Sequence, residues 1–125
     1  MRALSFLFAM KSILIIDSSV TFAGLFESRG WAVITCSDLS IAMGRMFGDD
    51  PYNVVLINCP EPLTDGLRLI KFTREIEHRR TTAIVMIAKN AIEAEESQWA
   101  GADRVLVSPV NSHSLVHVVE EQAKM

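Results

Sequence analysis

The sequence contains few of the residues that would tie it to a disulfide framework, a metal cluster or nucleic acid. Its two cysteines, Cys36 and Cys59, are too few for a disulfide framework or a metal ligand set, and they fit a reducing compartment. The net charge of −3 argues against nucleic acid or an anionic membrane as the main partner. No apolar run approaches the ~20 residues that span a bilayer. We therefore expect a cytoplasmic globular protein.

The first eleven residues are expected to be an extension of the domain. Arg2 followed by an apolar run resembles the start of a signal peptide, but the run is short and Lys11 leads directly into a strand pattern. A natural start at Met10 is the favoured explanation, and a packed extension or a targeting segment are the alternatives. Residues 12–124 are then expected to form one domain, long enough to bury a core without disulfides.

Short apolar runs alternate with amphipathic stretches along the rest of the chain. Half of the residues are hydrophobic and 22% are charged, which is ordinary for a globular domain. The apolar runs predict strands at residues 12–17, 31–36, 54–58, 83–88 and 104–107. The amphipathic stretches predict helices at residues 20–28, 67–77 and 91–100, one ending near Gly48, and a last one after residue 111. This alternation predicts an α/β fold: a doubly wound, flavodoxin-like (βα)5 domain with a five-stranded parallel sheet and helices on both faces.

Capping residues mark several of these helix ends. Gly30 and Gly101 follow helical patterns and favour a left-handed stop. Polar residues that favour helix starts precede three of the patterns. The candidates are Ser18 or Ser19, Ser37 or Asp38, and Asn111 or Ser112.

The third predicted strand ends on Asn58. Ligands and chemistry in open α/β sheets lie at the carboxyl ends of the strands, so Asn58 occupies a place where function is expected. An amide, however, cannot act as an anionic nucleophile. Two prolines and Asp65-Gly66 follow, a composition typical of turns, and the next helix is expected to begin at Leu67.

From Ser12 to Gln122 the chain resembles the receiver domain of response regulators. The features that carry the resemblance are Asp17 ending the first strand, Pro62 and Asp65-Gly66 after the third, Gly101-Ala102-Asp103 before the fifth, and Ser108-Pro109 after it. The resemblance implies a role in two-component or phosphorelay signalling. In the family, an aspartate ending the third strand is phosphorylated by a partner histidine kinase, and an acid pair helps to hold Mg²⁺. A Ser or Thr, a Lys before Pro and an aromatic residue then sense the phosphoryl group.

Nearly all of these functional positions hold other residues here. The substitutions are Asn58 at the phosphoacceptor, Ser18 at the second acid, Ala88 at the Ser or Thr, Ser108 at the lysine and Val105 at the aromatic position. Phosphoryl transfer needs a nucleophilic oxygen, a cation and a positioned positive group. We therefore expect no phosphorylation at Asn58, no catalytic residue, no cofactor and no Mg²⁺. Asp17 and Glu61 are the candidates for a weak remnant of the metal site.

Two further features require interpretation. His78, Arg79 and Arg80 follow the third helix pattern, and a solvated helix end is favoured over an anion site. Trp99 lies among polar residues, where partial burial against the sheet is the first interpretation and an exposed anchor for a partner is the alternative. In receiver-like folds the face made by the fourth helix, fifth strand and last helix often contacts partners. Ile92 and Trp99 are therefore candidates for a partner face.

The leading hypothesis is a receiver-like signal-transduction domain that lacks the phosphoacceptor aspartate. It would act as a phosphorylation-independent protein-interaction module, without enzymatic activity, on a signalling protein or on a second copy of itself. The alternative is a small flavodoxin-like ligand-binding or enzymatic domain that uses the strand-end crevice. That alternative has only the crevice in its support, since no glycine-rich phosphate loop follows the first strand.

Overall fold

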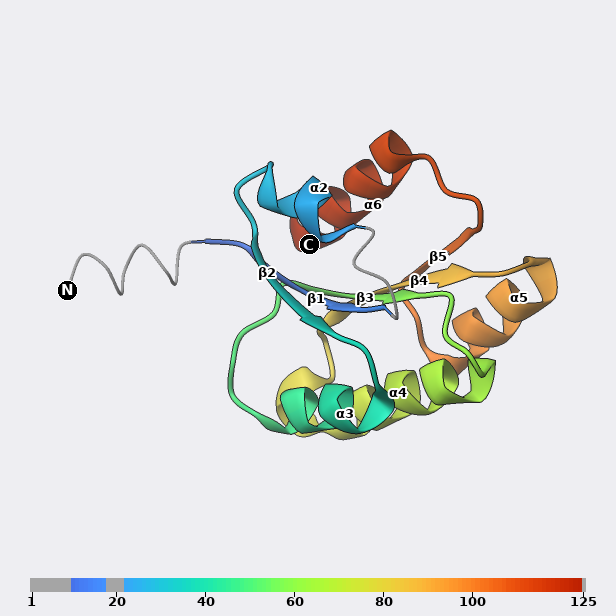
Figure 1. Cartoon of the computed structure of the whole chain (residues 1–125). Coiled ribbons are helices and arrows are strands. Elements are labelled where there is room, and N and C mark those ends of the chain that lie inside the picture. Colours follow the sequence, from blue (N-terminus) through green and yellow to red (C-terminus); the bar gives the residue numbers. More distant parts are fainter. Residues whose placement is uncertain (1–9, 18–21, 125) are drawn as a thin grey trace.

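One parallel sheet forms the centre of the molecule (Figure 1). The computed structural model describes residues 10–17 and 22–124. The strand order is β2-β1-β3-β4-β5, and each neighbouring pair is parallel. The strands are β1 (Ser12–Ile16), β2 (Ala32–Cys36), β3 (Val54–Asn58), β4 (Ala83–Ala88) and β5 (Arg104–Val107). The predicted five-stranded α/β fold is confirmed.

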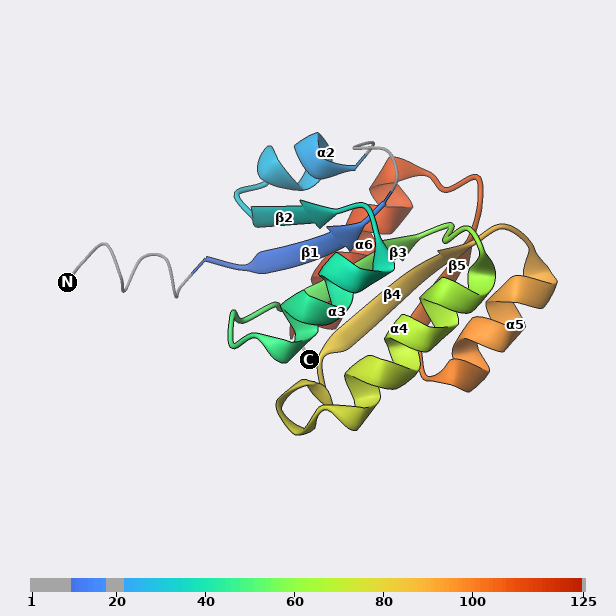
Figure 2. The ribbon, with the colours of Figure 1, turned by 60° about the horizontal axis from the view of Figure 1, so that its bottom comes forward.

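Helices cover both faces of the sheet, as predicted (Figures 1 and 2). They are α2 (Ala23–Glu27), α3 (Leu39–Phe47), α4 (Leu63–Glu75), the 3₁₀ turn η1 (Glu77–Arg79), α5 (Ala91–Ala100) and α6 (Ser112–Lys124). α2 and α6 lie on one face, and α3, α4 and α5 lie on the other. The expected caps Ser18 and Ser19 lie outside the described residues.

Successive residues of the central strands are buried on opposite faces of the sheet. In β3, Val54 and Leu56 pack with α2 and α6, whereas Val55 and Ile57 pack with α3 and α4. Covering helices on both sides explain why the strand is apolar throughout, without the polar alternation of a half-exposed strand. In β3, the hydrophobic core therefore ends at Asn58, the first polar residue of the strand.

The capping alternatives are settled by hydrogen bonds. Asp38 caps α3, since its carboxylate accepts from the Ile41 backbone N–H at 2.8 Å. Asn111 caps α6, since its side-chain oxygen accepts from the backbone N–H of His113 at 2.8 Å. At the other ends, Gly30 and Gly101 have φ of 85° and 118°, which confirms the predicted left-handed stops.

Helix α4 begins at Leu63, so the predicted start at Leu67 is wrong. Asp65-Gly66 lies within the first turn of the helix and forms no separate turn. Pro62 has the extended backbone of an N-cap, with φ of −74° and ψ of 162°. Gly66 is present because of packing: a Cβ there would lie 2.4 Å from Cγ of Pro60. A glycine that allows close contact resembles a turn glycine in the sequence.

Arg79 corrects a second expectation, because it is 3% exposed and does not belong to a solvated helix end. Its Nε donates to the carbonyl of Met46 at 3.0 Å, and its Nη2 donates to that of Gly48 at 2.7 Å. The guanidinium also lies 4.9 Å from the centre of the Tyr52 ring. Arg79 therefore satisfies carbonyls that the end of α3 leaves without helical partners.

Candidate functional site: the strand-end cleft

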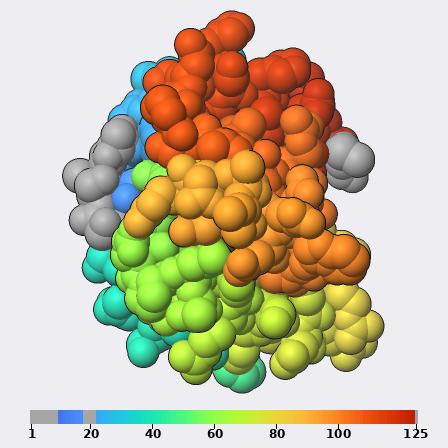
Figure 3. All heavy atoms as spheres, turned by 90° about the vertical axis from the view of Figure 1, so that its right-hand side faces the viewer, coloured from blue at the N-terminus to red at the C-terminus, as the bar shows by residue number. Residues whose placement is uncertain are grey.

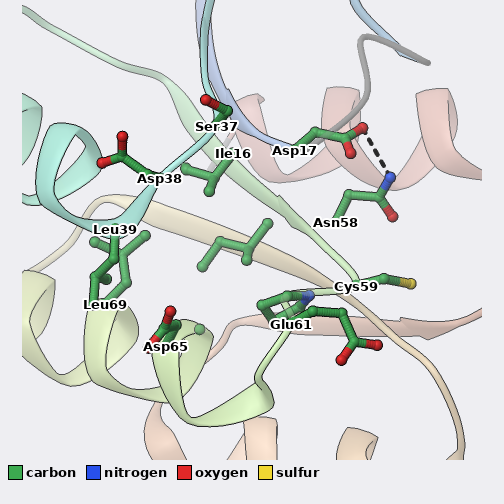
Figure 4. Close-up of a pocket in the computed structure, with 13 residues that line it drawn as sticks. Ile16, Asp17, Ser37, Asp38, Leu39, Asn58, Cys59, Glu61, Asp65 and Leu69 are labelled. Carbon is green, nitrogen blue, oxygen red and sulfur yellow. Dashed lines mark hydrogen bonds between the residues drawn. The ribbon is translucent and has the colours of Figure 1, made fainter.

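A cleft of about 230 Å³ opens at the carboxyl ends of β1 and β3, beside the first turns of α3 and α4 (Figure 4). Apolar side chains, among them Ile16 and Leu69, form part of its lining. Polar and acidic groups make up the rest. They are Asp17, Ser37, Asp38, Asn58, Glu61 and Asp65. The place where the sequence predicted function is thus a real cavity.

Asn58 and Asp17 are joined directly. Asn58 Nδ2 donates to Asp17 Oδ2 at 2.9 Å, and Figure 4 shows the contact as a dashed line. The sheet register explains it, because Ile16 pairs with Ile57 and the next residue of each strand lies at the same edge. An ionised aspartate at position 58 could not donate this hydrogen bond. The amide is therefore what allows the two strand ends to bind each other.

Glu61 forms an ion pair with Lys89. Its carboxylate points away from Asp17 and Asn58 (Figure 4), so the two acids proposed as a metal remnant do not face each other. Sequence reasoning missed Lys89. The available signal was its position directly after Ala88, the last residue of β4, which brings it to the functional edge of the sheet. The hydrogen bond with Glu61 raises the pKa of the Lys89 ammonium, which stays protonated at neutral pH.

Ala88, at the predicted Ser or Thr position, and Cys59, next to Asn58, are held by the packing and the backbone around them. Ala88 is completely buried, and its carbonyl accepts from the backbone N–H of Ser108 at 2.8 Å. Cys59, next to Asn58, has φ of 43°, a left-handed conformation that is uncommon for a residue with a side chain. Burial raises the pKa of the Cys59 thiol, which lowers the thiolate fraction at neutral pH.

Solved structures with a fold similar to that of this chain include receiver domains. A CheY-like receiver domain protein from Methanospirillum hungatei is 21% identical, with a TM-score of 0.80 over 93% of this chain and 95% of its own. A chemotaxis response regulator of Vibrio cholerae is 21% identical, with a TM-score of 0.80 over 91% and 99%. The chain has the receiver fold.

A third structure with the receiver fold belongs to a sensor histidine kinase of Pseudomonas aeruginosa and has a magnesium ion in its active site cleft. It is 22% identical, with a TM-score of 0.79 over 94% of this chain and all of its own. No family model matches the present sequence, and no curated protein matches it. At these identities the likeness concerns the fold.

The described part of this receiver fold does not fit a magnesium ion. Mg²⁺ prefers carboxylate oxygens together with several waters. Here the Asp17 carboxylate accepts a hydrogen bond from Asn58, and the Glu61 carboxylate is paired with Lys89. Across residues 10–17 and 22–124, no three His, Cys, Asp or Glu side chains gather in a way that could hold a metal. Ser18, at the position of the second acid, lies outside the described residues.

A second hollow lies on the outer side of α5, and it involves the predicted partner face. This open groove of about 790 Å³ runs along α5 and β5 and is lined by Ala91, Ala94, Glu95, Gln98, Trp99, Val105 and Val107. Trp99 is 84% exposed and Ile92 is 72% exposed, so partial burial of Trp99 is wrong. The reason is the helical phase: Ser97 is the buried residue of α5, and Trp99, two residues or about 200° further round the helix, faces solvent.

No helix among the described residues combines the length and apolar character needed to cross a membrane.

Proposed function

We propose that this chain is a receiver-type signal-transduction domain that works without phosphorylation at Asn58, as a protein-interaction module. The hydrogen bond from Asn58 to Asp17 is the observation that carries this proposal. Its donor is the side chain at the end of β3, where a phosphorylated receiver has its nucleophile. A neutral amide has little nucleophilicity, so the first requirement of phosphoryl transfer is missing. The chain is accordingly proposed to have no enzymatic activity.

The charges around the cleft support the same proposal. Asp17, Asp38, Glu61 and Asp65 line it, and they would repel an incoming phosphoryl group in the absence of a bound cation. Lys89 lies at the same edge of the sheet, and it is already paired with Glu61. Phosphate would have to compete with that carboxylate for the ammonium group.

The α5 surface supports the interaction part of the proposal. Trp99 and Ile92 are large, exposed and separated by two turns of one helix. Exposed tryptophans are common among the residues that contribute most to binding between proteins. We propose a protein partner of a cytoplasmic signalling pathway for this face. The neighbouring receivers are a chemotaxis response regulator and a part of a sensor kinase, which agrees with such a pathway.

Incubation with a small phosphodonor and Mg²⁺, followed by intact-protein mass spectrometry, tests the proposal. We expect no acid-stable, base-labile phosphoadduct on the wild-type chain. An acyl phosphate on the wild type would refute it. Phosphoramidate or acetyl phosphate should be used beside a receiver domain known to accept phosphate, so that a negative result reports on this chain and not on the reagent.

A second candidate function, the binding of a small ligand, is favoured by the cleft itself. Its apolar part includes Ile16 and Leu69, which suits an apolar group, while its acids disfavour nucleotides and other anions. Thermal-shift measurements with nucleotides and with small organic cations separate the two cases. Stabilisation by one of these compounds, lost on Leu69→Trp substitution in the cleft, would favour ligand binding over a purely structural cleft.

A further inference from the structure

Glu95 and Trp99 lie together in the groove along α5 and β5. They are four positions apart in the helix, which places their side chains on one face, a turn from each other. Both line the groove, and both are exposed, Trp99 to 84%. Figure 3 shows the segment of α5 and β5 (orange) at the surface between α4 (green) and α6 (red). An aromatic ring and a carboxylate therefore lie side by side where a partner can reach them.

The rest of the groove offers an apolar floor. Apart from Gln98, the remaining lining residues are small or apolar: Ala91, Ala94, Val105 and Val107. Val107 is 46% exposed, so this floor is not covered by another part of the described chain. From Ala91 to Trp99 the groove runs about 12 Å along the helix, which an extended segment of about four residues spans. The groove therefore has room for a short apolar segment.

The charge of the groove is negative and is not neutralised by neighbouring cations. Within the described residues, Glu95 is the one charged member of the lining, and no ion pair joins it to a basic side chain. Glu96 adds a second negative charge, and α5 contains no Lys or Arg. Lys71 on the adjoining helix α4 has Glu75 one turn away. Other basic residues beside α5 and β5 are already in ion pairs, which are Arg104–Glu121 at 2.8 Å, Arg74–Asp103 at 2.7 Å and Lys89–Glu61.

We propose that this groove binds an arginine-bearing apolar segment of a partner protein, with the guanidinium between the Trp99 ring and the Glu95 carboxylate. The proposal rests on the proposed function, because it names the chemistry of the partner for the face assigned there. A guanidinium suits this pair, since its flat face stacks on an indole and its edge donates two hydrogen bonds to one carboxylate. A lysine has no such flat face. The apolar side chains of the segment cover Val105 and Val107.

Titration with short amidated peptides tests the proposal. A pool with arginine at the centre, between apolar positions, supplies the best-binding peptide, which is then remade with lysine, citrulline or glutamate at that place. Citrulline keeps the shape of arginine without its charge. Indole N–H signals in ¹⁵N NMR spectra report separately on the exposed Trp99 and on Trp31, which is 5% exposed. The arginine peptide should shift the Trp99 signal and leave that of Trp31 in place. Citrulline should weaken binding on the order of tenfold, and glutamate should abolish it.

Glu95→Gln and Glu96→Gln are a matched pair of variants. They remove the same charge from the same helix, but of the two residues only Glu95 lines the groove. Glu95→Gln should weaken the arginine peptide on the order of tenfold and remove its advantage over the citrulline peptide, whereas Glu96→Gln should leave the affinity nearly unchanged. Trp99→Leu keeps an apolar side chain without the ring, and it should weaken binding by a similar factor. All three positions are exposed, so folding should be retained, which circular dichroism checks.

Three results would overturn the proposal. The first is that no arginine peptide moves the Trp99 signal at millimolar concentration, or that the citrulline peptide binds as tightly. The second is an equal loss in Glu95→Gln and Glu96→Gln, which would reduce the effect to net charge. The third is a Trp99 signal that moves with protein concentration alone, which would assign the groove to a second copy of the chain. The phosphodonor assay does not depend on Glu95 or Trp99, so failure of this proposal can be distinguished from failure of the proposed function.

Discussion

Replacing Asn58 with aspartate tests what the contact between β1 and β3 contributes. The substitution removes the donor of the hydrogen bond to Asp17, whose length is 2.9 Å, and sets two carboxylates in its place. A hydrogen bond to a charged group contributes about 1.5–3 kcal/mol. Two unit charges at this distance repel by roughly 6 kcal/mol at an effective dielectric constant of about 20, before any relaxation. Both residues are partly exposed, so rotation of the side chains and water relieve most of the repulsion.

We therefore expect Asn58→Asp to lower the free energy of unfolding by about 2–4 kcal/mol at pH 8 and low salt, measured by urea denaturation. The deficit should shrink on acidification. Repulsion makes one carboxyl of the pair hold a proton at a higher pH than an isolated aspartate does. The folded variant then binds more protons than the unfolded chain, so its stability rises relative to wild type as the pH falls toward the range of free aspartate, about 3.9.

A divalent cation should also affect the stability of the Asn58→Asp variant. The created carboxylate pair is a better ligand set than the wild-type pair, so Mg²⁺ at millimolar concentration should recover part of the stability of Asn58→Asp and leave wild type unchanged. Asn53→Asp is the matched control. The Asn53 side-chain oxygen accepts from the Ser12 backbone N–H at 2.8 Å, and aspartate keeps that acceptor. The reasoning is refuted if Asn58→Asp is as stable as this control at pH 8, or if acid does not narrow the difference.

Three more predictions concern the scaffold. Arg79→Ala should cost about 3 kcal/mol in urea unfolding, since it leaves buried carbonyls without donors; an effect below that of an average surface substitution would contradict its capping role. Gly66→Ala should lower the melting temperature, because overpacking against Pro60 costs about 1–3 kcal/mol of stability. An unchanged melting temperature would show that the Pro60 loop moves aside at no cost. Arg29 and Glu120 form an ion pair, with Arg29 Nε 3.0 Å from Glu120 Oε2. This pair lowers the pKa of Glu120, so the stability it contributes is present above the ordinary glutamate range and is lost as the pH falls through the lowered value. Glu120→Gln should make the free energy of unfolding fall less steeply with decreasing pH on the acid side. An unchanged pH dependence would show that the Arg29–Glu120 pair contributes no stability.

The strands could be predicted almost to the residue because burial on both faces makes each one a continuous apolar run. β3 begins at Val54 and ends at Asn58, as the pattern indicated. The end of α5 at Gly101 could be predicted because a left-handed backbone, which glycine adopts easily, commonly ends a helix. The start of α4 could not be read in the same way. Gly66 serves a contact with Pro60, and such a contact leaves no local mark that separates it from a turn.

In the candidate site, too, some features could be predicted from the sequence and others could not. Residues at strand ends were foreseeable, since parallel strands bring Asp17 and Asn58 to one edge. Their mutual hydrogen bond depends on side-chain rotation, and the pairing of Glu61 with Lys89 joins two separate loops. Arg79 is the strongest case. Its burial depends on the end of α3, which is far away in the sequence, so a basic run looked solvated.

The bond between Asn58 and Asp17 has a consequence for how such a domain could carry information. Both of its groups belong to the polypeptide, so it forms on folding and requires neither an ion nor a donor from solution. Under the proposed function, the chemical state of the domain is then constant over its lifetime. What varies is how many copies exist and where they gather. Output would follow synthesis, degradation and localisation of the protein, with a response time set by protein turnover instead of by the hydrolysis of a phosphoryl group.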